Sequence, residues 1–373
     1  MNFKKIVEIL AASVEFRDAL PNRPTDVEAL PKLISAIEAQ LQSSKQEIVR
    51  PNKRFSAPYC TKAFYLLHAH FLRIPVQDEG LQRDLEFVIE NSLHLVLGQL
   101  QISLARGWLI TSISCMNVCQ MLVSAVYDTV GYEQQFLQLP HLTSDILKHF
   151  RKKALRNVTD FLALPEADRS SLLRTLSPQA IDDVVRIGRS IPVVEIAKAE
   201  FVTLGESKVI AGGLVTLIVR LQVKNGTGAL SPTASPTTSD RIKFEDLAAA
   251  AGAAGKDFGE DALDDDDDYD NPMSAASRIA PKGPKSNPND SIYAPYLGTL
   301  DKKPFWWVIL AEPRMNNFIC APVRLHDLVT SKVAKMQFVA PSREGTYQFV
   351  LYVKSDSYIG VDLRQEVKVM IEY

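Results

Sequence analysis

The chain has 373 residues, and its 42 basic and 44 acidic side chains give a net charge of −2 with 46% hydrophobic residues. This composition is typical of folded globular domains, and it excludes a global electrostatic attraction to nucleic acid or anionic lipid. Four scattered cysteines are too few for a disulfide framework, so a reducing compartment is expected. No run of eighteen apolar residues predicts a membrane span, and the length predicts two or three domains.

Residues 1–150 are predicted to form an all-α helical bundle. The first segment, "FKKIVEILAASVEF", places its apolar residues near one stripe of a helix. Thr25, with Glu28 three residues later, fits the capping box that starts a helix. The segment "SAPYCTKAFYLLHAHFLRI" is apolar nearly all round, so it is expected at the centre of the bundle.

Residues 151–190 are predicted to form short helix–loop–helix units. Pro165 and Pro178 each suit a first helical turn, and Ser177 suits the cap before the second proline.

From residue 191 to residue 373 the hydrophobic period changes to two, which predicts strands. In "VTLIVRLQVK", Val219, Leu221 and Val223 share one face of the strand. About seven such segments favour a β-sandwich. The opposite, outward face of this strand carries Arg220, Gln222 and Lys224.

Residues 225–290 interrupt the predicted sandwich with low apolar content and clustered charge. Such a segment cannot offset the entropy cost of ordering, so a disordered surface loop between two strands is predicted. Two interpretations of its acidic run stay open, a solvated segment and an electrostatic contact with cations or basic partners. The run comprises Asp264, Asp265, Asp266, Asp267 and Asp268.

The sequence offers only weak signals for a catalytic or metal-binding site. His68 and His70 would point roughly 200° apart on a helix, so they cannot hold one ion together and are expected in the core. Cys115 and Cys119 could share a helical face, but no second cysteine pair has zinc-site spacing. We therefore predict no catalytic residue, no metal and no cofactor, and hence a protein that is not an enzyme.

Two adjacent tryptophans in "PFWWVIL" must face opposite sides of a strand. One of Trp306 and Trp307 is expected in the sandwich core. The other is expected against the helical domains, or else it marks a partner surface.

Several segments together resemble one module. "WWVILAEPRMNNFICAPVRL" and "MQFVAPSREGTYQFVLYVKSDSYIGVD" are similar to a module shared by two groups of proteins. One group is the endoplasmic-reticulum translocon J-protein of the SEC sixty-three family, and the other is the large Ski2-like RNA helicases. "VEFRDALPNRPTDVEALPKLI", "KAFYLLHAHFLRIP" and "QQFLQLPHLTSDIL" look more like the translocon protein. The resemblance implies helix-hairpin-helix-like units and a fibronectin type III or Ig-like sandwich, in a multidomain α+β fold.

The resemblance also implies a function. We expect a non-catalytic scaffold of the post-translational translocation complex at the cytosolic face of the endoplasmic reticulum membrane. It would dock on the protein-conducting channel and other complex subunits and promote the open channel. The family's J-domain motif and membrane spans are absent from this sequence, so membrane association is expected through a region outside it. The alternative is an accessory module of a large RNA helicase.

The predicted partner contacts form two groups. A strand–turn–strand tip carries Glu312, Arg314, Asn316 and Asn317. The outward residues Arg220, Gln222 and Lys224 form the second group. No small-molecule substrate is expected, and nucleic-acid binding is not expected under the scaffold interpretation.

Overall fold

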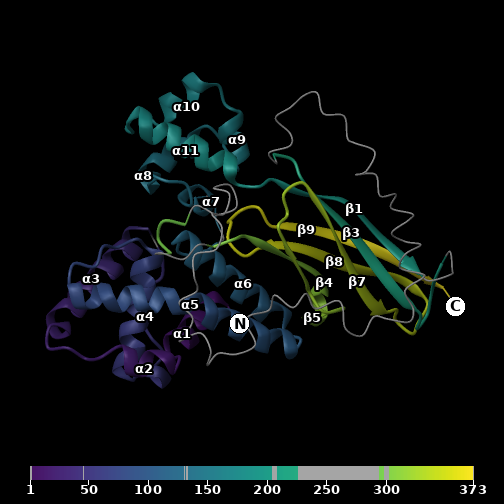
Figure 1. Cartoon of the computed structure of the whole chain (residues 1–373), viewed down its shortest axis with the longest axis horizontal. Helices are drawn as coiled ribbons and strands as arrows, with labels where there is room; N and C mark the ends of the chain where they lie inside the picture. The colour runs from purple at the N-terminus through teal and green to yellow at the C-terminus, as the bar shows by residue number, and fades with distance from the viewer. Residues whose placement is uncertain are drawn as a thin grey trace, which may run out of the picture.

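The computed structural model describes residues 2–44, 46–129, 131, 133–203, 208–225, 294–297 and 302–372. Its architecture is mixed α+β, with helices in the first half of the chain and two β-sheets in the second half (Figure 1). The predicted loop at 225–290 lies outside the described residues except for Asn225, and so does the acidic run Asp264 to Asp268.

Six helices form the N-terminal part. Apolar residues from all of them join one hydrophobic cluster, and α4 lies at its centre with most of its residues buried, as its apolar sequence predicts. Thr25 immediately precedes α3, but its side chain makes no capping bond, so the predicted capping box is wrong. The helices are α1 (Phe3–Ala11), α2 (Glu15–Ala19), α3 (Asp26–Ser43), α4 (Pro58–Phe71), α5 (Glu79–Ala105) and α6 (Leu109–Ser124).

Five shorter helices form a second hydrophobic cluster, with Phe150 stacked on Phe161. Ser177 accepts a hydrogen bond from the backbone N–H of Ala180 and caps α11 as predicted. The cluster begins at Phe136, so α7 and α8 pack with this group although they precede residue 151. The helices are α7 (Gln134–Leu137), α8 (Ser144–Lys152), α9 (Val158–Ala163), α10 (Glu166–Leu172) and α11 (Pro178–Ser190).

The strands form two sheets. One has the order β1-β3-β7, and the other has the order β2-β9-β8-β4-β5 with β6 also paired to β4. Every pairing is antiparallel except that of β2 with β9. The strands are β1 (Val194–Thr203), β2 (Val209–Ile210), β3 (Leu214–Val223), β4 (Phe305–Glu312), β5 (Asn317–Phe318), β6 (Val323–His326), β7 (Ser331–Val339), β8 (Gly345–Ser355) and β9 (Leu363–Glu372).

Side chains of both sheets share one hydrophobic cluster. Val219, Leu221 and Val223 point into it, as the alternation in the sequence predicts. The structure therefore shows two sheets with a common core. The fibronectin type III or Ig-like topology and the division into three domains stay predictions.

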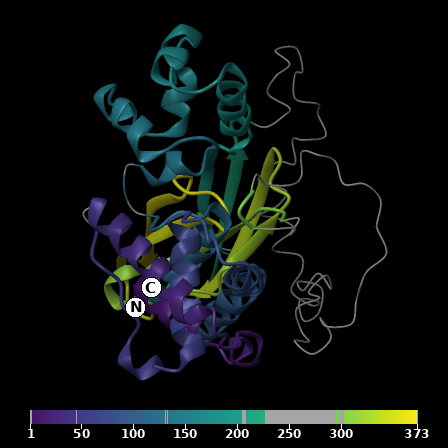
Figure 2. The same cartoon turned by 90° about the vertical axis from the view of Figure 1, so that its left-hand side faces the viewer.

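Strand β4 belongs to two cores. Trp306 lies in the cluster between the sheets, whereas Trp307 lies in the cluster of the helical bundle, and each is only 2% exposed. This confirms the prediction that the two tryptophans face opposite sides. The bundle therefore packs on the outer face of the larger sheet (Figures 1 and 2). Truncating a buried tryptophan costs about 3–5 kcal/mol, so this strand ties the sheet to the helices strongly.

Candidate docking surface

The segment 355–362, between β8 and β9, joins the sheet to the helices. The carboxylate of Asp362 accepts hydrogen bonds from the backbone N–H of Ser355 at 2.9 Å and from Nε2 of Gln120 on α6 at 3.0 Å. It also accepts a bond from Nζ of Lys354, a side chain that is 9% exposed, at 2.5 Å. A buried ammonium group is thus paired, and α6 is held against the end of the sheet.

The same segment contacts the second helical cluster. Gln138 donates to the carbonyl of Ile359 at 2.8 Å and accepts from its N–H at 3.1 Å. Gly360 has a φ of +82°, and a Cβ there would lie 2.8 Å from Gln135, so only glycine fits. We name residues 355–362 with Gln120 and Gln138 the fixed junction, because it connects both helical clusters to the sheet through hydrogen bonds that are buried or half-buried.

A second contact between the sheet and the helices lies at the other end of β4. After Glu312 the chain makes a 3₁₀ turn, η4 (Pro313–Met315), and Asn316 adopts a left-handed φ of +52°. Oδ1 of Asn316 accepts a hydrogen bond from the N–H of Ile110 at 2.9 Å. The first N–H groups of a helix have no partner within the helix, and Trp108 provides no side-chain cap for α6. Asn316 therefore caps α6 from the sheet.

Apolar side chains around this contact are exposed. Met315 is 71% exposed, Ile110 is 53% exposed and Trp108 is 47% exposed. Arg106 and Arg314 lie exposed in the same two turns. Tryptophan, methionine and arginine are enriched where proteins bind other proteins. We name residues 106–110 and 312–317 the exposed tip.

The structure separates the sequence-predicted contact residues into two places. Glu312, Arg314, Asn316 and Asn317 lie together at the exposed tip, with Glu312 half-buried. Asn316 is also used internally as a cap. Of the other three residues, Arg220 and Gln222 lie on β3 of the smaller sheet and Lys224 directly follows this strand, so they do not belong to the tip.

Three residues at the tip were missed by sequence reasoning, namely Trp108, Ile110 and Met315. The available signal was the sequence "RGWLI", in which two large apolar residues flank Leu109 just after a glycine. Met315 stands in a polar turn, where a large apolar side chain is expected to remain exposed. Their proximity could not be derived, because it depends on contact between α6 and a turn about 200 residues away.

The histidines of α4 are core residues, as predicted. His68 is hydrogen-bonded to the carbonyl of Phe64 and His70 to the carbonyl of Leu122. Burial lowers the pKa of each to about 4. Cys115 and Cys119 are buried free thiols, and burial raises the pKa of both. Within the described ranges no group of His, Cys, Asp or Glu could hold a metal ion, and no helix is long and apolar enough to cross a bilayer.

The helices and sheets define a multidomain α+β module in which a helical bundle is fixed to a sheet and an exposed tip remains. The Sec63 Brl domain family matches residues 1–368, so the chain belongs to this family.

The curated relatives include helicases and a translocation protein. The chain is 26% identical over 371 residues to a U5 small nuclear ribonucleoprotein 200 kDa helicase of Caenorhabditis elegans. It is 26% identical over 362 residues to an activating signal cointegrator 1 complex subunit 3-like protein of Dictyostelium discoideum. It is 23% identical over 492 residues to the translocation protein SEC63 homolog of Mus musculus. The family is thus shared by translocation proteins and helicases, and the family match alone does not choose between them.

The share of the relative's own length that the chain covers differs among these relatives. The alignments include 99%, 97% and 100% of this chain, in the order given. The chain spans 13% of the Caenorhabditis elegans helicase, 13% of the cointegrator complex subunit 3-like protein and 63% of the translocation protein.

Proposed function

We propose that this chain is a non-catalytic scaffold of the post-translational translocation machinery at the cytosolic face of the endoplasmic reticulum membrane. It docks through its exposed tip on cytosolic loops of the protein-conducting channel. The observation that carries this proposal is the exposed group of Trp108, Ile110 and Met315 where Asn316 caps α6.

The chemistry of the tip supports docking on another protein. Its centre is apolar, and Arg106 and Arg314 are its exposed charged groups. Basic channel loops would favour an acidic surface. The tip differs from such a surface, because Glu312 is the only acidic residue among residues 106–110 and 312–317. Binding energy is expected mainly from burying tryptophan and methionine, with the charges setting orientation.

The rigid connection supports an effect on the channel. A scaffold shifts a gating equilibrium only by binding one channel state more tightly than the other. Because the fixed junction and Trp307 hold the sheet against the helices, force at the tip is transmitted to the whole module rather than absorbed by a hinge. Such a rigid scaffold favours the open channel if its tip binds the open state more tightly than the closed state.

The translocation assignment rests further on coverage. The chain matches 63% of the translocation protein's length, so this module makes up most of that relative. In the helicase relatives the same module is 13% of the length.

The alternative is an accessory module of a large RNA helicase, and the identities of up to 26% to helicases favour it. It would require a basic surface for RNA. On the smaller sheet Lys198 pairs with Glu200 at 2.7 Å and Lys224 pairs with Glu195 at 2.6 Å. These pairs reduce the positive charge of that face, which supports the scaffold proposal.

The test is association of the purified chain with detergent-solubilised channel complex that lacks its native counterpart. Structured RNA serves as a parallel ligand and competitor. The proposal predicts saturable channel binding that RNA does not compete. RNA binding without channel binding would support the helicase alternative, and binding to neither would contradict docking by this chain alone.

A further inference from the structure

A groove of about 750 Å³ lies between α3 and the chain that connects α4 to α5. It is far from the tip in sequence, and neither the tip nor the fixed junction contributes a residue to it. Its apolar lining comes from both walls, with Ala29, Leu33 and Ala36 on α3 and Ile74, Val76 and Leu81 opposite.

The wall opposite α3 has unpaired backbone groups. Pro75 restricts Ile74 to an extended conformation, and residues 74–77 lie outside every helix and strand. Within the described part of the chain, the N–H groups of Val76 and Gln77 have no hydrogen-bond acceptor. The carbonyls of residues 74–77 likewise accept no bond there. A segment outside the helices and strands whose backbone donors and acceptors are free can pair with an extended chain.

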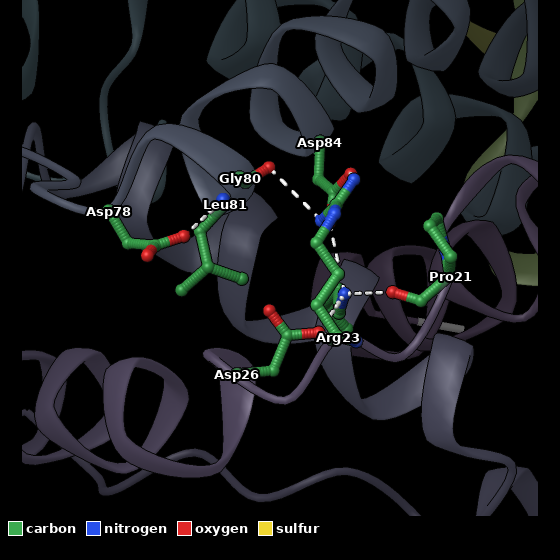
Figure 3. A network of polar contacts seen from close by, with 8 residues as sticks. Pro21, Arg23, Asp26, Asp78, Gly80, Leu81 and Asp84 are labelled. Atoms are coloured by element: carbon green, nitrogen blue, oxygen red, sulfur yellow. Dashed lines mark hydrogen bonds and ion pairs between the residues drawn. The ribbon is translucent and has the colours of Figure 1, made fainter.

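A buried charge network holds this wall in place (Figure 3). Nζ of Lys62, which is 1% exposed, bonds Asp26 at 2.5 Å, Asp84 at 3.0 Å and the carbonyl of Pro21 at 2.6 Å. Arg23 adds a bidentate pair with Asp84 at 2.6 and 2.8 Å and a bond to the carbonyl of Gly80. The network joins the start of α3 to the start of α5, so the groove is a built feature of the fold.

The charges near one end of the groove favour a cation. The network contains two cations and two anions and is neutral overall. Asp78 lines the groove beside it, and among the described residues its Oδ1 accepts a single hydrogen bond, the cap bond from the N–H of Leu81 at 2.9 Å. Oδ1 of Asp26, buried behind the rim, has no hydrogen-bond partner among the described residues. Glu28 and Lys32 on the rim are 3.7 Å apart and offset each other.

We propose that this groove binds an extended peptide segment of a partner protein, with apolar side chains on the floor and a lysine or arginine beside Asp78. The peptide pairs with the backbone of residues 74–77 as an added strand. The apolar lining, the free backbone groups and the unbalanced carboxylate each specify one part of this ligand. The proposal is independent of the channel and of the tip.

The probe is a fluorescein-labelled nonapeptide of alternating valine and lysine, measured by fluorescence anisotropy against the full chain. Ala36→Arg fills the groove from an exposed helical position, and we expect at least about tenfold weaker binding. Ala39→Arg adds the same side chain on the same helix outside the groove, and it is expected to leave binding unchanged.

Two further comparisons separate this mode from general adhesion. Asp78→Asn keeps an oxygen that can cap α5, so the fold is retained while affinity for the lysine peptide falls about threefold and becomes less salt-dependent. N-methylation of alternate peptide amides is expected to abolish binding, because it removes the donors that pair with residues 74–77. Equal binding to the wild type and to Ala36→Arg, or no saturation of the wild type, would overturn the proposal. A dimer that Ala36→Arg dissociates would show instead that a second copy fills the groove.

Discussion

The larger sheet contacts the helices at two places that differ in kind. At the fixed junction, Asp362 accepts half-buried hydrogen bonds from Gln120 and Ser355, and it pairs with the buried ammonium of Lys354. At the exposed tip one side chain, Asn316, caps α6, and large apolar groups around it remain exposed. The polar groups of the fixed junction find their hydrogen-bond partners within the chain, so this contact stabilises the fold. The second leaves apolar surface unburied, which is the property expected of a surface that binds another protein.

The largest effect is expected at the fixed junction. Asp362→Ala leaves the buried Lys354 ammonium unpaired and removes an acceptor for Gln120, so the free energy of unfolding should fall by about 3–5 kcal/mol. Urea unfolding monitored by tryptophan fluorescence measures it. The control is Glu366→Ala at an exposed position of β9, which should change stability by less than about 0.5 kcal/mol. Equal effects of the two variants would show that the junction is not a fixed contact.

Acid is expected to weaken the side of the bundle next to the junction. His70 is bonded to the carbonyl of Leu122, two residues before Ser124, whose Oγ bonds the carbonyl of Ser357. Burial lowers the pKa of His70 from 6.5 to about 4, so the unfolded state binds more protons between these values. The resulting stability is present above pH 6.5 and is lost as the pH falls towards 4.

The measurement is the loss of unfolding free energy between pH 7.5 and pH 4.5. His70→Gln should lose about 2–3 kcal/mol less than the wild type over this range. The contribution of Asp84 to the free energy of unfolding changes in a lower range of pH. Burial opposes its ionisation, but bonds from Arg23 and Lys62 lower its pKa below 3.8, so its contribution is lost only below that pH. An unchanged pH dependence in His70→Gln would contradict the buried neutral imidazole.

The cap at the tip is expected to have a moderate effect. Asn316→Gly keeps the backbone freedom that a positive φ requires but removes the acceptor for Ile110, so stability should fall by about 1 kcal/mol. Asn316→Asp retains an acceptor and places negative charge at a helix N-terminus, so it should be neutral or slightly stabilising. If both variants destabilise equally, the side-chain oxygen is not the cap.

The smallest effect on stability is expected for Glu312→Arg. Among the described residues Glu312 forms no ion pair, and it lies half-buried at the end of β4, so we expect a change within about 0.5 kcal/mol. Affinity for the channel should nevertheless fall severalfold, since basic channel loops would then face another cation. Surface plasmon resonance against the solubilised channel measures this. Unchanged affinity would remove Glu312 from the docking surface.

Local pattern explains which parts of this molecule could be predicted. Strand alternation alone separates Trp306 from Trp307, because neighbouring residues of a strand face opposite sides. The all-apolar character of α4 likewise predicts its central place and the buried state of His68 and His70. Such features depend on periods of two or 3.6 residues and are visible in a short window of sequence.

Features that depend on distant contacts could not be predicted in this way. Asn316 caps α6 by accepting a hydrogen bond from the N–H of Ile110, which lies 206 residues earlier in the chain. The exposed tip therefore forms only when the sheet packs against the bundle. The second helical cluster starts at Phe136 because α7 and α8 bury their apolar faces there, which no local break in the sequence marks. The groove beside α3 combines segments from two helices and a connection, and its unpaired backbone has no signature in residue types.

The central claim is that the exposed tip, rather than any exposed apolar residue, binds the channel. Met315 at the tip and Met370 on β9 provide a matched pair, because they are 71% and 64% exposed. The measurement is the dissociation constant of Met315→Ala and of Met370→Ala for the solubilised channel. We predict at least about tenfold weaker binding for Met315→Ala and a change within about twofold for Met370→Ala. Equal affinities of the two variants, or a larger loss for Met370→Ala, would contradict the account.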